Sequence, residues 1–100
     1  MKNFDEQIDI TKNIKMIEML KYQILNSVAD LHSTFIQNTE QDEKKEIFSD
    51  LIILTYILAN RLNISPLDLE NKIIKKLKLA VLDEKDNFNE DIKELLRYFN

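Results

Sequence analysis

The sequence predicts an all-α protein, a four-helix bundle with long antiparallel first and second helices and two shorter helices. The chain of 100 residues contains no glycine and one proline. Tight turns and phosphate-binding loops depend on glycine, so P-loop and Rossmann folds are excluded. Apolar residues recur at three- and four-residue steps, as they do in amphipathic helices. A chain of this length is expected to form one domain.

The first helix is expected from about Thr11 to Gln37, because its apolar residues form one stripe. The members of this stripe are Ile14, Ile17, Leu20, Ile24, Val28, Leu31 and Phe35. Residues 1–10 are expected to be a loosely packed leading segment, a short turn on which Phe4 and Ile8 pack down.

The second helix is expected to begin at Asp42 or Glu43 and to end at Asn63. Residues 38–42 are polar and aperiodic, so they form the preceding loop. The acids at the start of the helix lie where the helix dipole favours negative charge. Residues 46–63 are apolar on nearly every side, which predicts that this helix is covered by several neighbours.

The third helix has the clearest local signal in the chain. Ser65 can cap it, Pro66 fits its first position, and Asp68 can answer the cap three residues later. The helix is expected to end between Leu79 and Leu82. A charged connection follows, and Asn87 with Glu90, or Asn89 alone, then opens a short last helix that ends near Phe99.

Composition excludes several classes of function. The chain has no cysteine, so disulfides and cysteine-ligated zinc are excluded. A net charge of −4 argues against nucleic-acid binding. The first residues carry acids and no apolar run, unlike a signal peptide. The most apolar window, Leu51–Ala59, is shorter than a membrane span. We therefore expect a protein of the cytoplasm with no nucleic-acid or membrane partner.

The second helix and its ending, Glu46–Pro66, resemble the second helix of the MazG-like family of all-α nucleoside triphosphate pyrophosphohydrolases. In that family an acidic pair opens an apolar helix with an Ala-Asp-Arg-Leu-Gly-Ile type of ending. The matching residues here are Asp50, Ala59, Arg61, Leu62 and Ile64. Asn60 replaces the usual acid and Asn63 the usual glycine. The tail, Lys72–Leu79 followed by Asp91–Tyr98, is similar to a short bacterial subgroup of the family.

The resemblance implies a magnesium site made of carboxylates, and this chain keeps few of them. The family has Glu-Glu-x-x-Glu on the first helix and Glu-x-x-Asp on the second. Asp50 keeps the place of the aspartate, whereas Glu46 lies one residue before that of the glutamate. The residues at the first-helix positions are Tyr22, Gln23 and Asn26. Amide oxygens bring no charge, so a site with one or two carboxylates is expected to bind Mg²⁺ weakly.

The candidate site residues follow from this placement. Asp50 and Glu46 are the candidate metal ligands, and Gln23, Asn26 and Asn60 are candidate site-lining residues. Asp50 is expected to be at least half buried and hydrogen-bonded near Gln23 or Asn26, because it lies within an apolar run. It can equally be a structural hydrogen-bonding residue. The amides can also be the polar side of an amphipathic helix without function.

The phosphate-binding candidates are Lys72 and Lys76, which lie in a basic run of the third helix. Related enzymes place basic side chains there. A solvated run that complements the helix dipole is the alternative interpretation. No catalytic residue can be named from the sequence.

Two functions remain open. The first is magnesium-dependent binding or hydrolysis of a nucleoside triphosphate to monophosphate and pyrophosphate. The second is a non-catalytic helical interaction module that kept the scaffold and lost the chemistry. Either protein is expected to be a homo-oligomer, most simply a dimer paired through its first two helices, because the second helix is apolar nearly all round.

Overall fold

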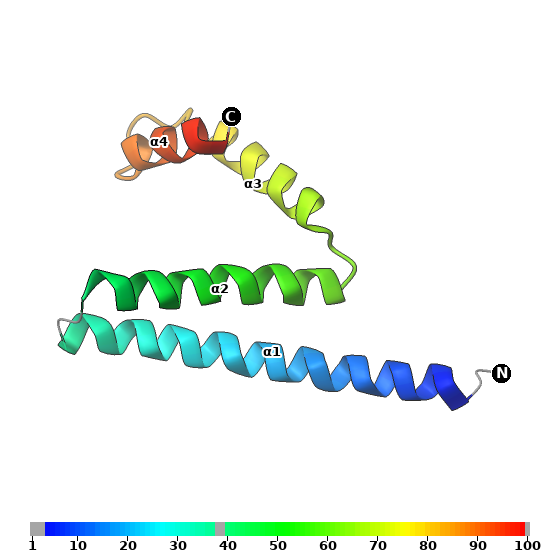
Figure 1. The fold of residues 1–100 in the computed structure, drawn as a ribbon. Coiled ribbons are helices and arrows are strands. Elements are labelled where there is room, and N and C mark those ends of the chain that lie inside the picture. Colours follow the sequence, from blue (N-terminus) through cyan, green and yellow to red (C-terminus); the bar gives the residue numbers. More distant parts are fainter. Residues whose placement is uncertain (1–3, 38–39, 100) are drawn as a thin grey trace. The chain divides into compact units, whose positions relative to one another are not determined.

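The computed structural model describes residues 4–37 and 40–99, which form four helices and no strand (Figure 1). The helices are α1 (Phe4–Gln37), α2 (Gln41–Arg61), α3 (Pro66–Ala80) and α4 (Asn89–Phe99). The prediction of an all-α chain with two long helices followed by two shorter ones is confirmed. The chain divides into two compact units, Met1–Ile64 and Ser65–Asn100. Within the described ranges, no single helix is long and apolar enough to cross a membrane.

α1 begins earlier than its apolar stripe predicted. The helix already includes Phe4, whereas the prediction placed its start at Thr11. No glycine or proline interrupts the segment between them, and the hydroxyl of Thr11 donates to the carbonyl oxygen of Gln7 at 2.9 Å. Thr11 therefore continues the helix and does not cap it. The expected packing of Ile8 is wrong, because its side chain is exposed; the side chain of Phe4 lies outside the described part of the structure.

α1 and α2 lie side by side and run antiparallel (Figure 1), with heptad spacing along the line where they meet. In each helix, one row of residues recurs at alternating steps of four and three and is at least partly buried. The row of α1 consists of Asn13, Ile17, Leu20, Ile24, Ser27, Leu31 and Thr34. The row of α2 consists of Lys44, Ile47, Leu51, Leu54, Leu58 and Arg61. We call these two rows the seam. This spacing keeps one row of each helix turned toward the other, as in a coiled coil.

The seam is apolar in its middle and polar at both ends. Leu20, 8% exposed, is the only buried hydrophobic residue among those that the structure describes. At one end, Nη1 of Arg61 donates to Oδ1 of Asn13 at 2.9 Å. At the other end Thr34, 5% exposed, donates to the carbonyl oxygen of Leu31 at 2.6 Å. Polar residues in an apolar seam specify register, so the Asn13–Arg61 bond helps to fix which residues of the two helices face each other.

α2 ends in a Schellman motif built without glycine. Asn63 has a φ of 67°. Its N–H donates to the carbonyl oxygen of Asn60 at 3.1 Å, and the N–H of Ile64 donates to that of Ala59 at 2.9 Å. Asparagine tolerates this left-handed conformation better than most residues other than glycine. The predicted helix end at Asn63 is wrong, since that residue is the left-handed residue beyond the end at Arg61.

In the second unit, α3 and α4 pack against each other. Ser65 caps α3 as predicted, because its Oγ accepts a hydrogen bond from the N–H of Asp68 at 3.1 Å, and Pro66 occupies the first helical position. The face of α4 that packs on α3 contains Ile92, Leu96 and Phe99, which are partly buried. Capping and apolar spacing thus act together in this unit.

The loop between α3 and α4 is closed by Asn89. This residue opens α4, in agreement with one of the two predicted starts. Its side chain is 6% exposed, and its Nδ2 donates to the carbonyl oxygens of Val81 at 2.9 Å and Asp83 at 3.0 Å. Asn89 therefore satisfies carbonyl groups beyond the end of α3, a role that its place in the sequence did not predict.

Candidate functional site

One side of the α1–α2 hairpin carries the polar residues that the sequence singled out. We call it the polar flank, and all of its residues are exposed. They are Met19, Gln23, Asn26 and Asp30 of α1 and Glu43, Glu46, Asp50, Ile53, Ile57 and Asn60 of α2. These positions border the seam rows at steps of three and four residues, so the helical repeat turns them all to the same side.

A groove of about 400 Å³ lies on the polar flank between α1 and α2. Its lining residues are Gln23, Asn26 and Ser27 from α1 and Asp50, Ile53 and Leu54 from α2. The structure thus brings Asp50 together with both amide side chains that were expected to face it. The three residues come from two helices and are far apart in the sequence, so the pairing of α1 with α2 is what forms this site.

Asp50 is exposed. It lines the groove near Gln23 and Asn26, as expected, whereas the hydrogen bond expected for it is wrong. Its carboxylate has no hydrogen bond or ion pair with any residue that the structure describes. The apolar residues beside it in the sequence do not enclose it, because Leu51 turns into the seam and Phe48 to the opposite side of the hairpin. An exposed carboxylate is hydrated and needs no protein partner. The structural hydrogen-bonding role is therefore wrong for Asp50.

The other candidates of α2 lie outside the groove lining. Glu46 is exposed one helical turn before Asp50, on the same flank. Asn60 is exposed near the end of α2, about 15 Å along the helix from Asp50. Its carbonyl oxygen accepts the hydrogen bond from Asn63 at 3.1 Å. Asp50 is therefore the only carboxylate among the residues that line the groove.

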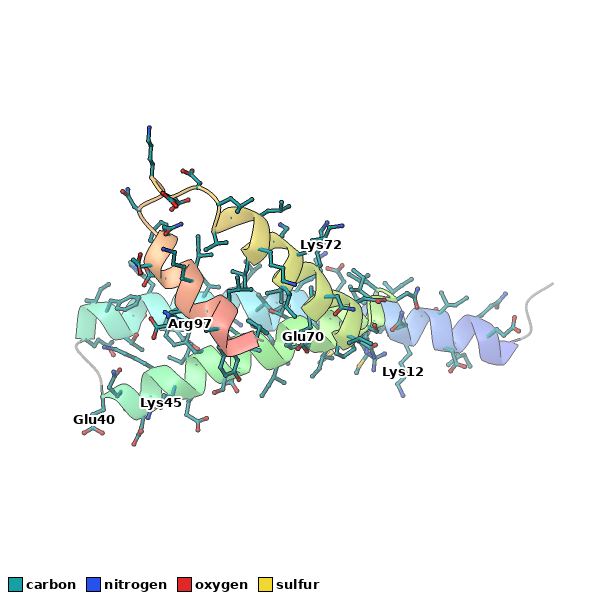
Figure 2. All side chains as sticks on the ribbon, turned by 90° about the horizontal axis from the view of Figure 1, so that it is seen from above. Lys12, Glu40, Lys45, Glu70, Lys72 and Arg97 are labelled. Atoms are coloured by element: carbon teal, nitrogen blue, oxygen red, sulfur yellow. The ribbon has the colours of Figure 1, made fainter. Side chains whose placement is uncertain are left out.

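The basic candidates belong to the second unit. Lys72 and Lys76 are exposed residues of α3, and Figure 2 shows Lys72 extending from that helix. Neither forms an ion pair with a described residue. Both side chains are therefore available to an anionic group, and their contact with phosphate stays a prediction.

The sequence did not single out Ser27, Ile53 or Leu54 as part of the site. Ser27 lies four residues after Gln23, on the same face of α1, and this spacing is a signal that could have found it. Ser27 also belongs to the seam, is partly buried and lines the groove between the two helices. Ile53 and Leu54 give the groove an apolar wall, which no polar motif could reveal.

The groove offers oxygen donors from four side chains. They are the carboxylate of Asp50, the amide oxygens of Gln23 and Asn26 and the hydroxyl of Ser27. These hard oxygens are of the kind that Mg²⁺ binds. Only one of the four side chains is charged, and the described residues contain no group of three or more His, Cys, Asp or Glu side chains that could hold a metal ion. The donors fit magnesium in kind, and their low charge predicts weak binding.

The candidate site of this helical protein lies in a groove between two long antiparallel helices, α1 and α2, and oxygen atoms of side chains from both helices line it. The model of the MazG-like family matches residues 10–95. The chain belongs to this family and is thereby related to the fold of the nucleoside triphosphate pyrophosphohydrolases. The match includes both the α1–α2 and the α3–α4 units. No curated protein and no solved structure matches the chain.

Proposed function

We propose that the groove on the polar flank is a weakened magnesium–nucleotide site, which binds a nucleoside triphosphate loosely and hydrolyses it slowly to monophosphate and pyrophosphate. The observation that carries this proposal is the shared groove of Gln23, Asn26 and Asp50. Membership of the MazG-like family supports it, because the pyrophosphohydrolases of this fold act on such substrates. The cytoplasm, where nucleotides are abundant, is the proposed location.

Each residue has a proposed role. Asp50 is the metal-binding carboxylate, and Glu46 adds negative charge one helical turn away. Gln23 and Asn26 supply neutral oxygens to the metal and amide N–H groups to the nucleotide. Bound Mg²⁺ supplies the positive charge that offsets the phosphate chain and activates water. Asn60 of the polar flank is a proposed further contact to the nucleotide. Lys72 and Lys76 of α3, in the second unit, remain the predicted phosphate-binding residues.

The low charge of the groove limits the affinity. A single exposed carboxylate attracts a divalent cation through water, where the interaction of two unit charges 4 Å apart is worth about 1 kcal/mol. Sites with few carboxylates bind their ions in about the millimolar range. We therefore expect both Mg²⁺ and its nucleotide complex to bind at millimolar and not at micromolar concentration.

The experiment is release of pyrophosphate from a panel of common and modified nucleoside triphosphates at millimolar Mg²⁺. The native chain is compared with Asp50→Ala and with a matched control, Asp30→Ala, which removes an exposed carboxylate of the polar flank outside the groove lining. Release that is lost in Asp50→Ala and kept in Asp30→Ala supports the proposal. Equal rates in all three proteins would refute it, because the activity would then come from elsewhere.

A second candidate function is a non-catalytic helical interaction module, and a separate observation favours it. The described residues bury one hydrophobic side chain, Leu20, and leave many large apolar side chains exposed. Such surfaces mark interfaces. If no triphosphate of the panel is hydrolysed and none raises the melting temperature of the native chain, the module is the better description.

A further inference from the structure

The two ends of the α1–α2 hairpin are joined in different ways. At one end the chain itself connects α1, which ends at Gln37, to α2, which begins at Gln41. At the other end, which we call the open end, α1 continues past the end of α2 to Phe4 and α2 leads on to the second unit (Figure 1). The side chains of Asn13 and Arg61 meet there. Contact between the helices at the open end therefore depends on side chains.

The hydrogen bond at the open end joins the two helices directly. Nη1 of Arg61 donates to Oδ1 of Asn13 at 2.9 Å, and both residues are partly buried. A hydrogen bond from a charged donor is stronger than one between neutral groups, and burial raises the cost of breaking it. Thr34, the buried polar residue near the connected end, donates instead to the carbonyl oxygen of Leu31 within α1. The two polar ends of the seam therefore act differently, and the bond at the open end links α1 to α2.

The groove lies between the connected end and the open end. Asp50 is about 16 Å along α2 from Arg61 and about 14 Å from Gln41, at 1.5 Å per residue. The groove takes its lining from both helices, so its width changes whenever the helices separate at the open end. Leu20 is the only buried hydrophobic residue among those that the structure describes. Few other contacts therefore oppose such a separation.

We propose that Asn13 and Arg61 are positioning residues of the groove, which hold the open end closed and thereby set the distance between Asp50 and the amide side chains across from it. Polar residues at seam positions fix register at a cost in stability, so an apolar pair in their place would hold the helices together without fixing how they face each other. The effect on the reaction rests on the proposed function, because a misplacement of about 1 Å can lower a rate about 100-fold. The effect on the distance between the helices does not rest on it.

The distance across the groove tests the proposal without any ligand. The chain has no cysteine, so Met19→Cys and Glu46→Cys place one spin label on each helix, at exposed positions of the polar flank outside the groove lining. Double electron–electron resonance measures the distribution of distances between the two labels. Labelled chain is diluted with unlabelled chain, so that only the pair within one chain contributes.

The variant Asn13→Leu/Arg61→Leu replaces the bond with an apolar pair. Its helix content and its urea midpoint are expected to stay those of the native chain, whereas its distance distribution broadens. Asn13→Asp keeps the Oδ1 acceptor and is expected to keep the native distribution. So is the control Thr34→Val, which removes a hydroxyl that bonds within α1. If the double variant loses its helix content, Asn13→Ala, which removes the acceptor alone, replaces it. A distribution as narrow as that of the native chain, or one that broadens equally in Thr34→Val, overturns the proposal.

Release of pyrophosphate at millimolar Mg²⁺ tests the effect on the reaction. The variant without the bond is expected to be slower than the native chain by about tenfold or more, and Asn13→Asp to keep the native rate. Equal rates beside a broadened distribution would overturn the positioning role in the reaction. If the native chain releases no pyrophosphate, the proposed function fails, and the distance distributions alone decide whether the two residues position the groove.

Discussion

The two flanks of the α1–α2 hairpin differ although they border the same seam. Ile53 lines the groove of the polar flank beside Asp50, whereas Ile52, the residue before it, is turned toward the side of the exposed residues Phe48 and Leu62, which we call the apolar flank. The helical repeat turns consecutive residues by about 100°, so one helix can present two chemically different surfaces. The comparison shows that Asp50 and the amides of Gln23 and Asn26 gather on one side of a single helix pair, away from Phe48, Ile52 and Leu62.

The pairing of α1 with α2 along the seam determines which residues lie next to each other on both flanks. Any slip of α1 against α2 would change which residues face each other on the polar flank and which rows continue on the apolar flank. The seam buries little, so its few buried or paired residues carry most of this specificity. The following predictions test the seam first and then each flank.

The largest effect is expected from Leu20→Ala. Leu20 is the buried hydrophobic residue of the seam, and removing a buried leucine side chain costs about 3 kcal/mol of unfolding free energy. Its neighbour Met19 is exposed on the polar flank, so Met19→Ala is the matched control, with an expected loss below about 0.5 kcal/mol. Urea denaturation at one protein concentration measures both values. Equal losses would mean that the seam is not where the hairpin is held together.

A smaller effect is expected at the polar end of the seam. The bond from Arg61 to Asn13 is 2.9 Å long and partly buried, and hydrogen bonds to charged groups contribute about 1.5 kcal/mol or more. A double-mutant cycle of Asn13→Ala and Arg61→Ala is expected to give a coupling energy of about 1 to 1.5 kcal/mol in urea denaturation. Additive losses would show that the bond does not help to set the register.

The sequence predicted the helices well where local chemistry determines them. Ser65 and Pro66 begin α3 by capping and by a fixed φ, and both are local effects. Predictions failed where a residue type has two uses. Thr11 looked like a boundary and instead bonds back to Gln7 within α1. Asn63 looked like the last helical residue and instead takes the left-handed position that usually belongs to glycine. In both cases the types of the neighbouring residues do not determine the backbone conformation of the residue.

The sequence also named some of the residues that line the groove, and their site roles stay predictions. The approximate placement of α1 on the family motif was enough to name Gln23 and Asn26, which do line a groove with Asp50. The hydrogen bond expected for Asp50 was wrong, because the residue is exposed and its apolar neighbours in the sequence turn to the seam and to the other flank. Neighbours along a helix are not neighbours in packing. Burial depends on the pairing of two helices, which the sequence of one helix does not contain.

On the polar flank, adding carboxylates is expected to strengthen magnesium binding. The double variant Gln23→Glu/Asn26→Glu places two more carboxylates beside Asp50 in the groove. At 10 mM Mg²⁺ a site of about millimolar affinity, as proposed for the native chain, stabilises the folded state by about 1.4 kcal/mol, and a site of tenfold higher affinity by about 2.7 kcal/mol. The difference is measured as a larger rise in melting temperature for the variant. The control Gln7→Glu/Gln37→Glu makes the same change of charge at exposed positions of α1 outside the groove lining. A rise of the same size in the control would show that general screening, and not a site, is responsible.

The smallest effect is expected on the apolar flank, from the double variant Glu18→Lys/Lys21→Glu. It exchanges the partners of the ion pair, which lie 2.8 Å apart and are both more than half exposed. Exposed pairs contribute less than about 1 kcal/mol, and an exchange within one helix turn changes the unfolding free energy by less than about 0.5 kcal/mol. Urea denaturation of the native chain and the double variant measures this difference. The single variant Glu18→Lys leaves two cations of like sign one helical turn apart, so its unfolding free energy is expected to fall by up to about 0.5 kcal/mol at low salt and to recover as salt screens the repulsion. A single variant whose unfolding free energy depends on salt no more than that of the native chain would show that the ion pair does not contribute to stability.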